Sequence, residues 1–164
     1  MPAEVTTPSD REVRVTRKFN APRQLVWDAH TKPGLVQKWM TGYPGWDLPV
    51  CEMDVRVGGR YRWAWKNQQD GTTGFGFHGS FTEVNAPSKL VHEEFYDPGD
   101  LPADMPMDPC IVSLELSEAN GVTTLVCTMK FSSKETRDAA VATGMTDGME
   151  VGYARLDDMF KQAA

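Results

Sequence analysis

The chain has 164 residues, a length that fits one compact domain. Hydrophobic residues make up 40% and charged residues 24%, which is ordinary for a globular protein and argues against wholesale disorder. The net charge of −6 argues against a general nucleic-acid binder and against recruitment to an anionic membrane surface, because both need a positive field.

Residues 1–10 are polar and contain two prolines, so we expect a disordered tail followed by one domain over 11–164. The tail lacks the apolar core of a signal peptide, and no apolar run approaches the roughly 20 residues that span a bilayer. Cys51, Cys110 and Cys127 form no C-x-x-C pair, which favours free thiols over a disulfide framework or a zinc site. These features predict a cytoplasmic protein without a metal or other cofactor.

The first predicted elements are a strand and two short helices. Hydrophobic residues at alternate positions over 13–19 predict an amphipathic strand. Asn20 and Pro22 favour the start of a helix that runs to about residue 30, and a second short helix is predicted over 35–40.

Strand and turn signals follow. Aromatic residues alternate with polar or small ones in the middle of the chain, and Asn120-Gly121 is a hairpin signal. The predicted strands cover 52–57, 61–66, 75–81, 90–96, 111–116 and 122–131. The segment 97–109 contains four prolines, which exclude a central strand, so we expect a loop there that closes over a functional site.

A long amphipathic helix is predicted at the C-terminus. Ser132 and Glu135 have the spacing of a capping box at its start, and apolar residues between Met145 and Phe160 share one face. Glycines at 144, 148 and 152 each cost about 1 kcal/mol relative to alanine inside a helix. Two explanations stay open: close approach of the backbone to a neighbour, or a helix break near Gly144.

This order of elements predicts an α+β fold. One curved antiparallel sheet of about six or seven strands wraps around the long C-terminal helix, and two short helices follow the first strand.

Four segments resemble, in order, the START-like (SRPBCC) superfamily, and more narrowly the group named after the activator of heat-shock-protein-90 ATPase homologue. They are VTRKFNAPRQLVWDAHTKPGLVQKWM near the start, MDVRVGGRYRW, GSFTEVNAPSKLVHEEF and TGMTDGMEVGYARLDDMF. The resemblance implies a helix-grip fold, whose cavity between sheet and last helix commonly holds small hydrophobic molecules. Tyr153 stands where the group often carries tryptophan, a change that would reshape one cavity wall.

Several catalytic motifs fail on context. Residues 74–79 satisfy G-x-G-x-x-G literally, but they lie inside a strand pattern and open no helix. His92-Glu93 begins like a zinc-protease motif, but Tyr96 stands where the second histidine is needed. No G-x-S-x-G segment occurs, so the sequence contains no esterase nucleophile elbow.

Large aromatic and methionine side chains are candidates for the walls of a ligand cavity, because rings with polar tips and adaptable thioethers suit such a site. For any one of them the alternative is that it fills the core. The candidate ligand-binding residues are Trp39, Tyr43, Trp63, Trp65, Phe75, Phe77, Phe95, Met145, Met149 and Tyr153.

Three polar residues are candidates for acid–base chemistry: His78, His92 and Glu94. Alternation puts His92 and Glu94 on one face of their strand. If that face looks inward, the pair could act as a general base, and if it looks outward, both side chains are solvated. The sequence leaves the choice open.

Three functions therefore compete. The leading hypothesis is a protein that binds a small hydrophobic or aromatic ligand. The second is an enzyme acting on a polyketide-like or aromatic substrate in the same cavity. The third is an interaction protein with a chaperone or repressor partner. A homodimer is compatible with each.

Overall fold

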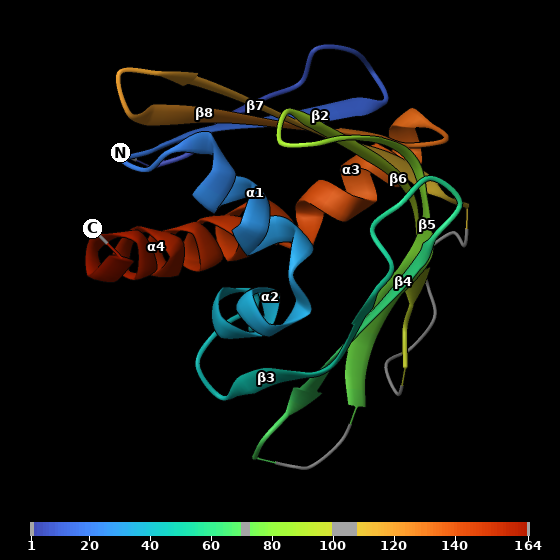
Figure 1. The fold of residues 1–164 in the computed structure, drawn as a ribbon. Helices are drawn as coiled ribbons and strands as arrows, with labels where there is room; N and C mark the ends of the chain where they lie inside the picture. Colours follow the sequence, from blue (N-terminus) through green and yellow to red (C-terminus); the bar gives the residue numbers. More distant parts are fainter. Residues whose placement is uncertain (1, 70–72, 100–107, 164) are drawn as a thin grey trace.

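The computed structural model describes residues 2–69, 73–99 and 108–163 (Figure 1). Along the chain, the described strands and helices follow in this order: β1 (Glu4–Thr6), β2 (Glu12–Phe19), α1 (Arg23–Thr31), α2 (Pro33–Trp39), β3 (Trp46–Met53), β4 (Arg60–Asn67), β5 (Thr73–Asn85), β6 (Lys89–Asp97), β7 (Cys110–Ala119), β8 (Val122–Lys130), α3 (Lys134–Ala142) and α4 (Met145–Ala163).

All strands of the described chain join one antiparallel sheet of eight strands, in the order β1-β2-β8-β7-β6-β5-β4-β3. The sheet curves around α4, and α1 and α2 lie on the same side as α4 (Figure 1). We call this side of the sheet the inner face. The arrangement confirms the predicted α+β class and the helix-grip layout, with β1 in addition to the predicted strands.

The N-terminal segment corrects one prediction. Residues 4–6 pair with β2, with Val5 opposite Val15, so this stretch is a strand rather than a disordered tail. All three of its side chains are exposed, so no hydrophobic alternation marked it. Backbone pairing to an existing strand supplies the order, and sequence patterning does not show such pairing.

Two element boundaries also differ from the predictions. The strand predicted over 52–57 is β3, which ends at Met53, because residues 54–59 form a turn in which Gly58 has a φ of +84°. The helix cap is Ser133, whose hydroxyl accepts a hydrogen bond from the Thr136 N–H at 3.1 Å, one residue later than predicted. It caps α3, a separate short helix.

Both explanations for the glycine series are correct, at different positions. Gly144 has a φ of +80° and separates α3 from α4, which confirms the break. Gly152 lies against Trp39: a Cβ atom there would stand 3.1 Å from Cε3 of the indole ring. Glycine therefore lets α4 approach α2 closely.

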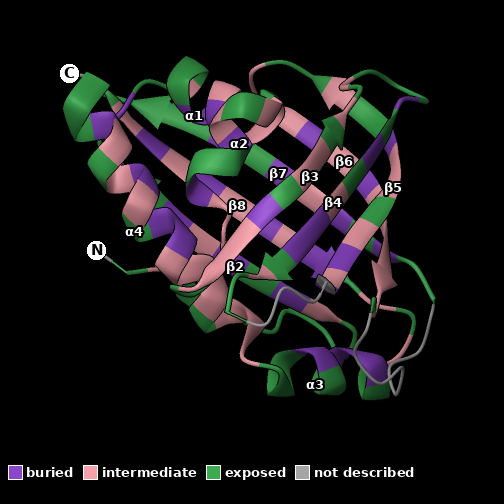
Figure 2. Ribbon diagram, turned by 90° about the horizontal axis from the view of Figure 1, so that it is seen from below, coloured by how far each residue is buried: buried purple, intermediate pink, exposed green. Residues whose placement is uncertain are grey.

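One end of the interior is completely filled. Val13, Val15 and Phe19 of β2 are 0–1% exposed, as are Leu125 of β8 and Leu156 of α4. Phe19 meets Tyr153 and Phe160 of α4 edge-on, at ring-centroid distances of 5.6 and 5.7 Å. Buried residues line the contact between α4 and the strands behind it (Figure 2). This packing holds the sheet and the helix together.

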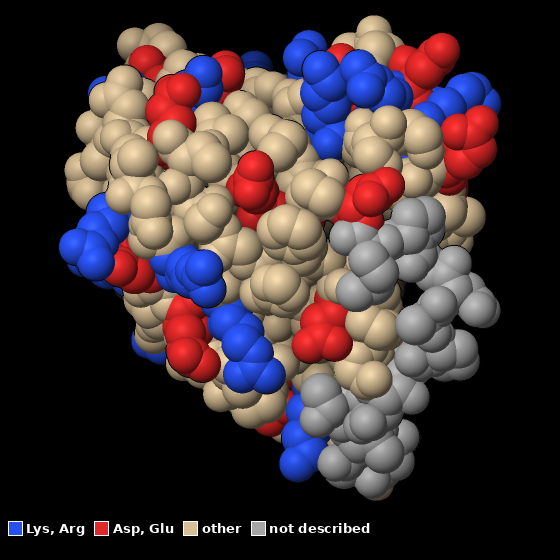
Figure 3. All heavy atoms as spheres, turned by 90° about the vertical axis from the view of Figure 1, so that its right-hand side faces the viewer, with Lys and Arg blue, Asp and Glu red and all other residues tan. Residues whose placement is uncertain are grey.

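The opposite face of the sheet looks to solvent. Figure 3 shows the side of the molecule that carries the outer surface of β4, β5 and β6, where basic and acidic side chains are interspersed. Arg62 pairs there with Glu52 at 3.9 Å, and both side chains are exposed.

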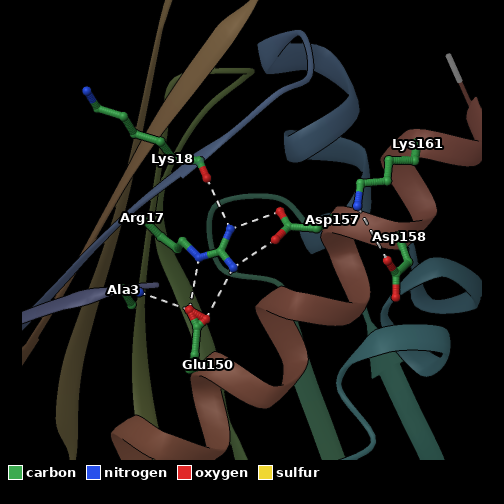
Figure 4. Close-up of polar contacts among 7 residues, drawn as sticks. All are labelled: Ala3, Arg17, Lys18, Glu150, Asp157, Asp158 and Lys161. Carbon is green, nitrogen blue, oxygen red and sulfur yellow. Dashed lines mark hydrogen bonds and ion pairs between the residues drawn. The ribbon is translucent and has the colours of Figure 1, made fainter. Parts of the chain in front are cut away.

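A buried ion-pair cluster anchors α4 to β2 (Figure 4). The Arg17 side chain is 4% exposed, and its guanidinium donates to Glu150 at 3.0 Å and to both carboxylate oxygens of Asp157 at 2.9 Å. The two acids are seven residues apart, so they lie two turns apart on one face of α4. The Ala3 N–H also donates to Glu150, at 2.9 Å, which ties the N-terminal strand to the same point.

Candidate functional site

Strand register assigns the inner face of the sheet in its β4–β6 region. Residues directly opposite each other in an antiparallel pair point to the same face. Tyr61 lies opposite Gly79, which lies opposite Glu94, and Trp63 lies opposite Phe77, which lies opposite Tyr96. Tyr61 belongs to the core in contact with the helices, so all of these positions face inward.

The interior is less completely covered here than at the filled end. A set of inward-facing residues remains partly exposed, and we call it the open end. It comprises Trp63, Phe77, Glu94, Tyr96, Met145 and Met149. Met149 and Met145 continue the apolar face of α4, one and two turns before the buried Tyr153. Mostly apolar walls with few polar groups are typical of small-molecule sites.

Tyr61 spans the strands next to the open end. Its ring lies across Gly79, where a Cβ atom would stand 3.2 Å from Tyr61 Cε1. The hydroxyl donates to the Glu93 carbonyl at 3.0 Å, and His92 Nδ1 lies 2.8 Å from the Tyr61 hydroxyl oxygen. Burial lowers the pKa of His92 to about 4. The imidazole is therefore neutral near pH 7.

Glu94 is the acidic group of this region. Burial raises the pKa of its carboxyl to about 7. Near neutral pH the carboxyl therefore exists in both forms and can donate or accept a hydrogen bond.

Trp63, a residue of the open end, has an unpaired indole donor. Its Nε1 is buried and has no hydrogen-bond acceptor among the residues that the structure describes. Trp39 and Trp65 differ, because their indole N–H groups donate to the carbonyls of Ala29 and Met40, each at 2.7 Å. A buried donor without a partner costs free energy, and an acceptor on a bound molecule would recover it.

The structure brings only part of the predicted ligand-binding set to the open end. Trp63, Phe77, Met145 and Met149 are there, and Phe75 adjoins them on the inner face, stacked on Trp65 at 4.9 Å.

Most of the other predicted residues lie in the core or, in the case of Tyr43, at the surface next to Gly148 of α4. Trp39, Trp65 and Tyr153 are buried core residues, 3–6% exposed. Trp39 stacks on Tyr153 at 6.0 Å, so these two rings pack α2 against α4. Tyr43 is 49% exposed. Core filling was the alternative for each aromatic residue, and the burial of these three agrees with it.

Phe95 and His78 lie on the outer face, which corrects their assignment to the site. Their rings stack on each other at 5.4 Å and 11°, and they line a surface depression with Arg60 and Arg62. The alternation that turns His92 and Glu94 inward turns Phe95 outward.

Tyr96 of the open end and the adjoining Tyr61 are absent from the predicted ligand-binding residues. Tyr61 alternates in phase with the predicted Trp63, and Tyr96 with the acid–base candidate Glu94. That phase was the available signal. Of the segment expected to close the site, 97–109, the part over 100–107 lies outside the described residues.

Within the described ranges, no group of three or more His, Cys, Asp or Glu side chains is placed to hold a metal ion. None of the helices described there is long and apolar enough to cross a membrane.

Comparison with known proteins identifies a family. Residues 20–161 match the family described as "Activator of Hsp90 ATPase homolog 1-like protein". No curated protein matches the chain significantly.

Solved structures share the fold along nearly the whole chain. A protein from Rhodobacter sphaeroides is 29% identical, with a TM-score of 0.87 over 98% of this chain and 99% of that one. Ms6760 from Mycobacterium smegmatis is 21% identical, with a TM-score of 0.81 over 96% of each chain. CalU16 from Micromonospora echinospora is 18% identical, with a TM-score of 0.58 over 98% of this chain and 94% of that one.

Proposed function

Because the chain belongs to the activator of Hsp90 ATPase homolog 1-like family, whose fold commonly binds hydrophobic ligands, we propose that it binds a small hydrophobic or aromatic molecule at the open end. The ligand would lie between the inner face of β4–β6 and the first turns of α4. The observation that carries the proposal is the incomplete burial of inward-facing apolar side chains there, beside the unpaired Trp63 N–H.

A neutral apolar dye such as Nile red tests the proposal by fluorescence titration. Phe77→Ala and Met149→Ala each remove one wall of the open end, from the sheet and from the helix. Losing such contact area weakens binding by roughly 1–2 kcal/mol, or about 5- to 30-fold. Far-ultraviolet circular dichroism of each variant verifies that it is folded.

Phe95→Ala is the matched control, because it removes an aromatic ring of the same sheet from the outer face. Its dye affinity should equal that of the wild type. Equal losses in Phe95→Ala and Phe77→Ala, or no loss in either inner-face variant, would place the dye elsewhere and contradict the proposal.

An enzyme using the same site is the second candidate, favoured by Glu94. A carboxyl whose pKa is raised to about 7 is suited to general acid–base catalysis at neutral pH. An aromatic ligand identified by native mass spectrometry of the purified protein supplies the substrate. Turnover that is lost in Glu94→Gln while binding persists supports catalysis, and equal turnover in both proteins excludes a role for this carboxyl.

Interaction with a chaperone or repressor, and a homodimer, stay predictions. The large hydrophobic side chains that are exposed in the described structure come from separate parts of the chain: Val5, Leu25, Tyr43, Val57, Ile111 and Val141. No observation among them favours either.

A further inference from the structure

The unpaired donor and the charges around it narrow the class of ligand, on the premise that the open end binds one as proposed above. We propose that the ligand is uncharged and carries a hydrogen-bond acceptor, such as a carbonyl oxygen, that binds the indole N–H of Trp63.

The Trp63 ring is held in place by its neighbours. Tyr61 lies 4.6 Å away between ring centroids, His92 lies 6.0 Å away at 78°, and Trp65 lies 6.5 Å away at 77°. Rings packed on several sides leave the indole little freedom to turn its N–H toward another acceptor. An acceptor therefore has to come to the N–H.

Two other inward-facing tryptophans, Trp39 and Trp65, have paired indole donors. Trp39 and Trp65 both donate to backbone carbonyls of the α1–α2 region, at 2.7 Å. Buried donors in folded proteins are almost always paired in this way. Trp63 is on the same strand as Trp65 and in the same phase, yet its donor is free among the described residues.

Charge argues against an anionic ligand. None of the described residues of the open end is lysine or arginine. Arg17, the inward-facing arginine of β2, is already bonded to Glu150 and Asp157. A ligand carboxylate could accept from Trp63, but it would have to be buried near the Glu94 carboxyl without a balancing cation, which is costly.

The same donor argues against a cationic ligand. An ammonium group has no lone pair to offer to the Trp63 N–H, so the indole would stay unpaired. A neutral carbonyl oxygen accepts a hydrogen bond from the Trp63 N–H and adds no charge beside the Glu94 carboxyl.

The groups around Glu94 do not balance a charge either. Burial, and after it the nearby Glu94 carboxylate, raises the pKa of Tyr61 of β4, Cys110 of β7 and Cys127 of β8, that of Cys127 to about 12, so these groups carry no charge near pH 7. His92 on its own strand is neutral, because burial lowers its pKa to about 4. The described residues that α4 adds to the open end, Met145 and Met149, are apolar.

Four matched probes test the inference: naphthalene, 2-acetylnaphthalene, 2-naphthoate and 2-(aminomethyl)naphthalene. Binding is measured by titration, and the indole N–H signals are followed in ¹H–¹⁵N spectra, with Trp63→Phe assigning the signal of Trp63. One net hydrogen bond corresponds to about a 3- to 10-fold gain in affinity, so the ketone should bind tighter than naphthalene by that factor. Its binding should move the Trp63 indole proton downfield by more than those of Trp39 and Trp65.

Trp63→Phe keeps an aromatic ring and removes the donor. In this variant the ketone should lose its advantage, while naphthalene binding persists. The naphthoate should bind more weakly as pH rises from 6 to 8.5, and Glu94→Gln should remove that dependence.

The outcomes separate the inference from the proposed function. If naphthalene and the ketone bind equally and the Trp63 signal does not move, the donor has no role and only the inference is wrong. If the amine or the naphthoate binds tightest, the argument from charge is wrong. If none of the four binds, the proposed apolar site and the inference fall together.

Discussion

Replacing Glu94 with glutamine should stabilise the protein at alkaline pH and leave its stability nearly unchanged at acidic pH. The reason is that the pKa of Glu94 is raised in the folded protein from the ordinary 4.5 to about 7. Between these two values the folded chain holds one proton that the unfolded chain has released. The free energy of unfolding therefore falls as pH rises through this window and is level above it.

The magnitude follows from the width of the window. Each pH unit costs the folded state about 1.4 kcal/mol, which gives roughly 3 kcal/mol in all, and partial exposure of the carboxyl reduces this to about 2–3 kcal/mol. Glutamine cannot titrate. The difference in unfolding free energy between Glu94→Gln and wild type should therefore be below about 1 kcal/mol at pH 5 and rise to about 2–3 kcal/mol at pH 8.5.

Urea titrations from pH 5 to 8.5, followed by tryptophan fluorescence, measure that difference. Burial lowers the pKa of both His30 and His92 to about 4, so they destabilise the folded state as pH falls below their ordinary 6.5. These contributions are present in both proteins and cancel. Glu93→Gln, on the outer face of the same strand, is the control for the loss of a carboxyl group from β6. A difference for Glu94→Gln that is flat with pH would refute the assignment of a buried, protonated carboxyl.

The remaining predictions concern the stability of the helices and strands around the candidate site. Arg17→Ala leaves two carboxylates of α4 without their cation, so it should destabilise the protein by about 3 kcal/mol. Calorimetry should show a fall of roughly 6–12 °C in Tm, and a fall under 2 °C would show that the ion pairs do not stabilise the fold. Gly148→Ala should stabilise α4 by up to about 1 kcal/mol, because only Tyr43 is nearby, at 4.0 Å from the added Cβ atom. Gly152→Ala should destabilise the protein by about 1–2 kcal/mol, because its Cβ atom would stand 3.1 Å from the Trp39 ring, and equal urea midpoints for the two variants would contradict this close approach. Ser133→Ala should cost about 1 kcal/mol in thermal unfolding through loss of the helix cap, and Ser132→Ala, which removes no cap, should cost less; the reverse order would restore the predicted cap.

Sequence patterning alone determined the class of fold. Alternation over 13–19 and helical periodicity over 145–160 are local properties, since they depend on the 2.0- and 3.6-residue repeats of the backbone. The strand over Glu4–Thr6 was missed because its side chains are all exposed, and its order comes from pairing with β2. Arg17 was also missed, although it occupies an inward phase between Val15 and Phe19; that phase was the signal of its burial.

The candidate site depended on the tertiary structure at two points. A period of two shows that His92 and Glu94 share a face, but both faces of β6 mix apolar and polar residues, so only packing against the helices decides which one looks inward. Tryptophans of one strand likewise differ in role for a reason outside that strand. Trp65 finds the Met40 carbonyl at the end of α2, and Trp63, two residues earlier, finds no acceptor in the described structure. Local sequence fixes which side chains exist and how they alternate, whereas hydrogen-bond satisfaction and burial are set by residues distant along the chain.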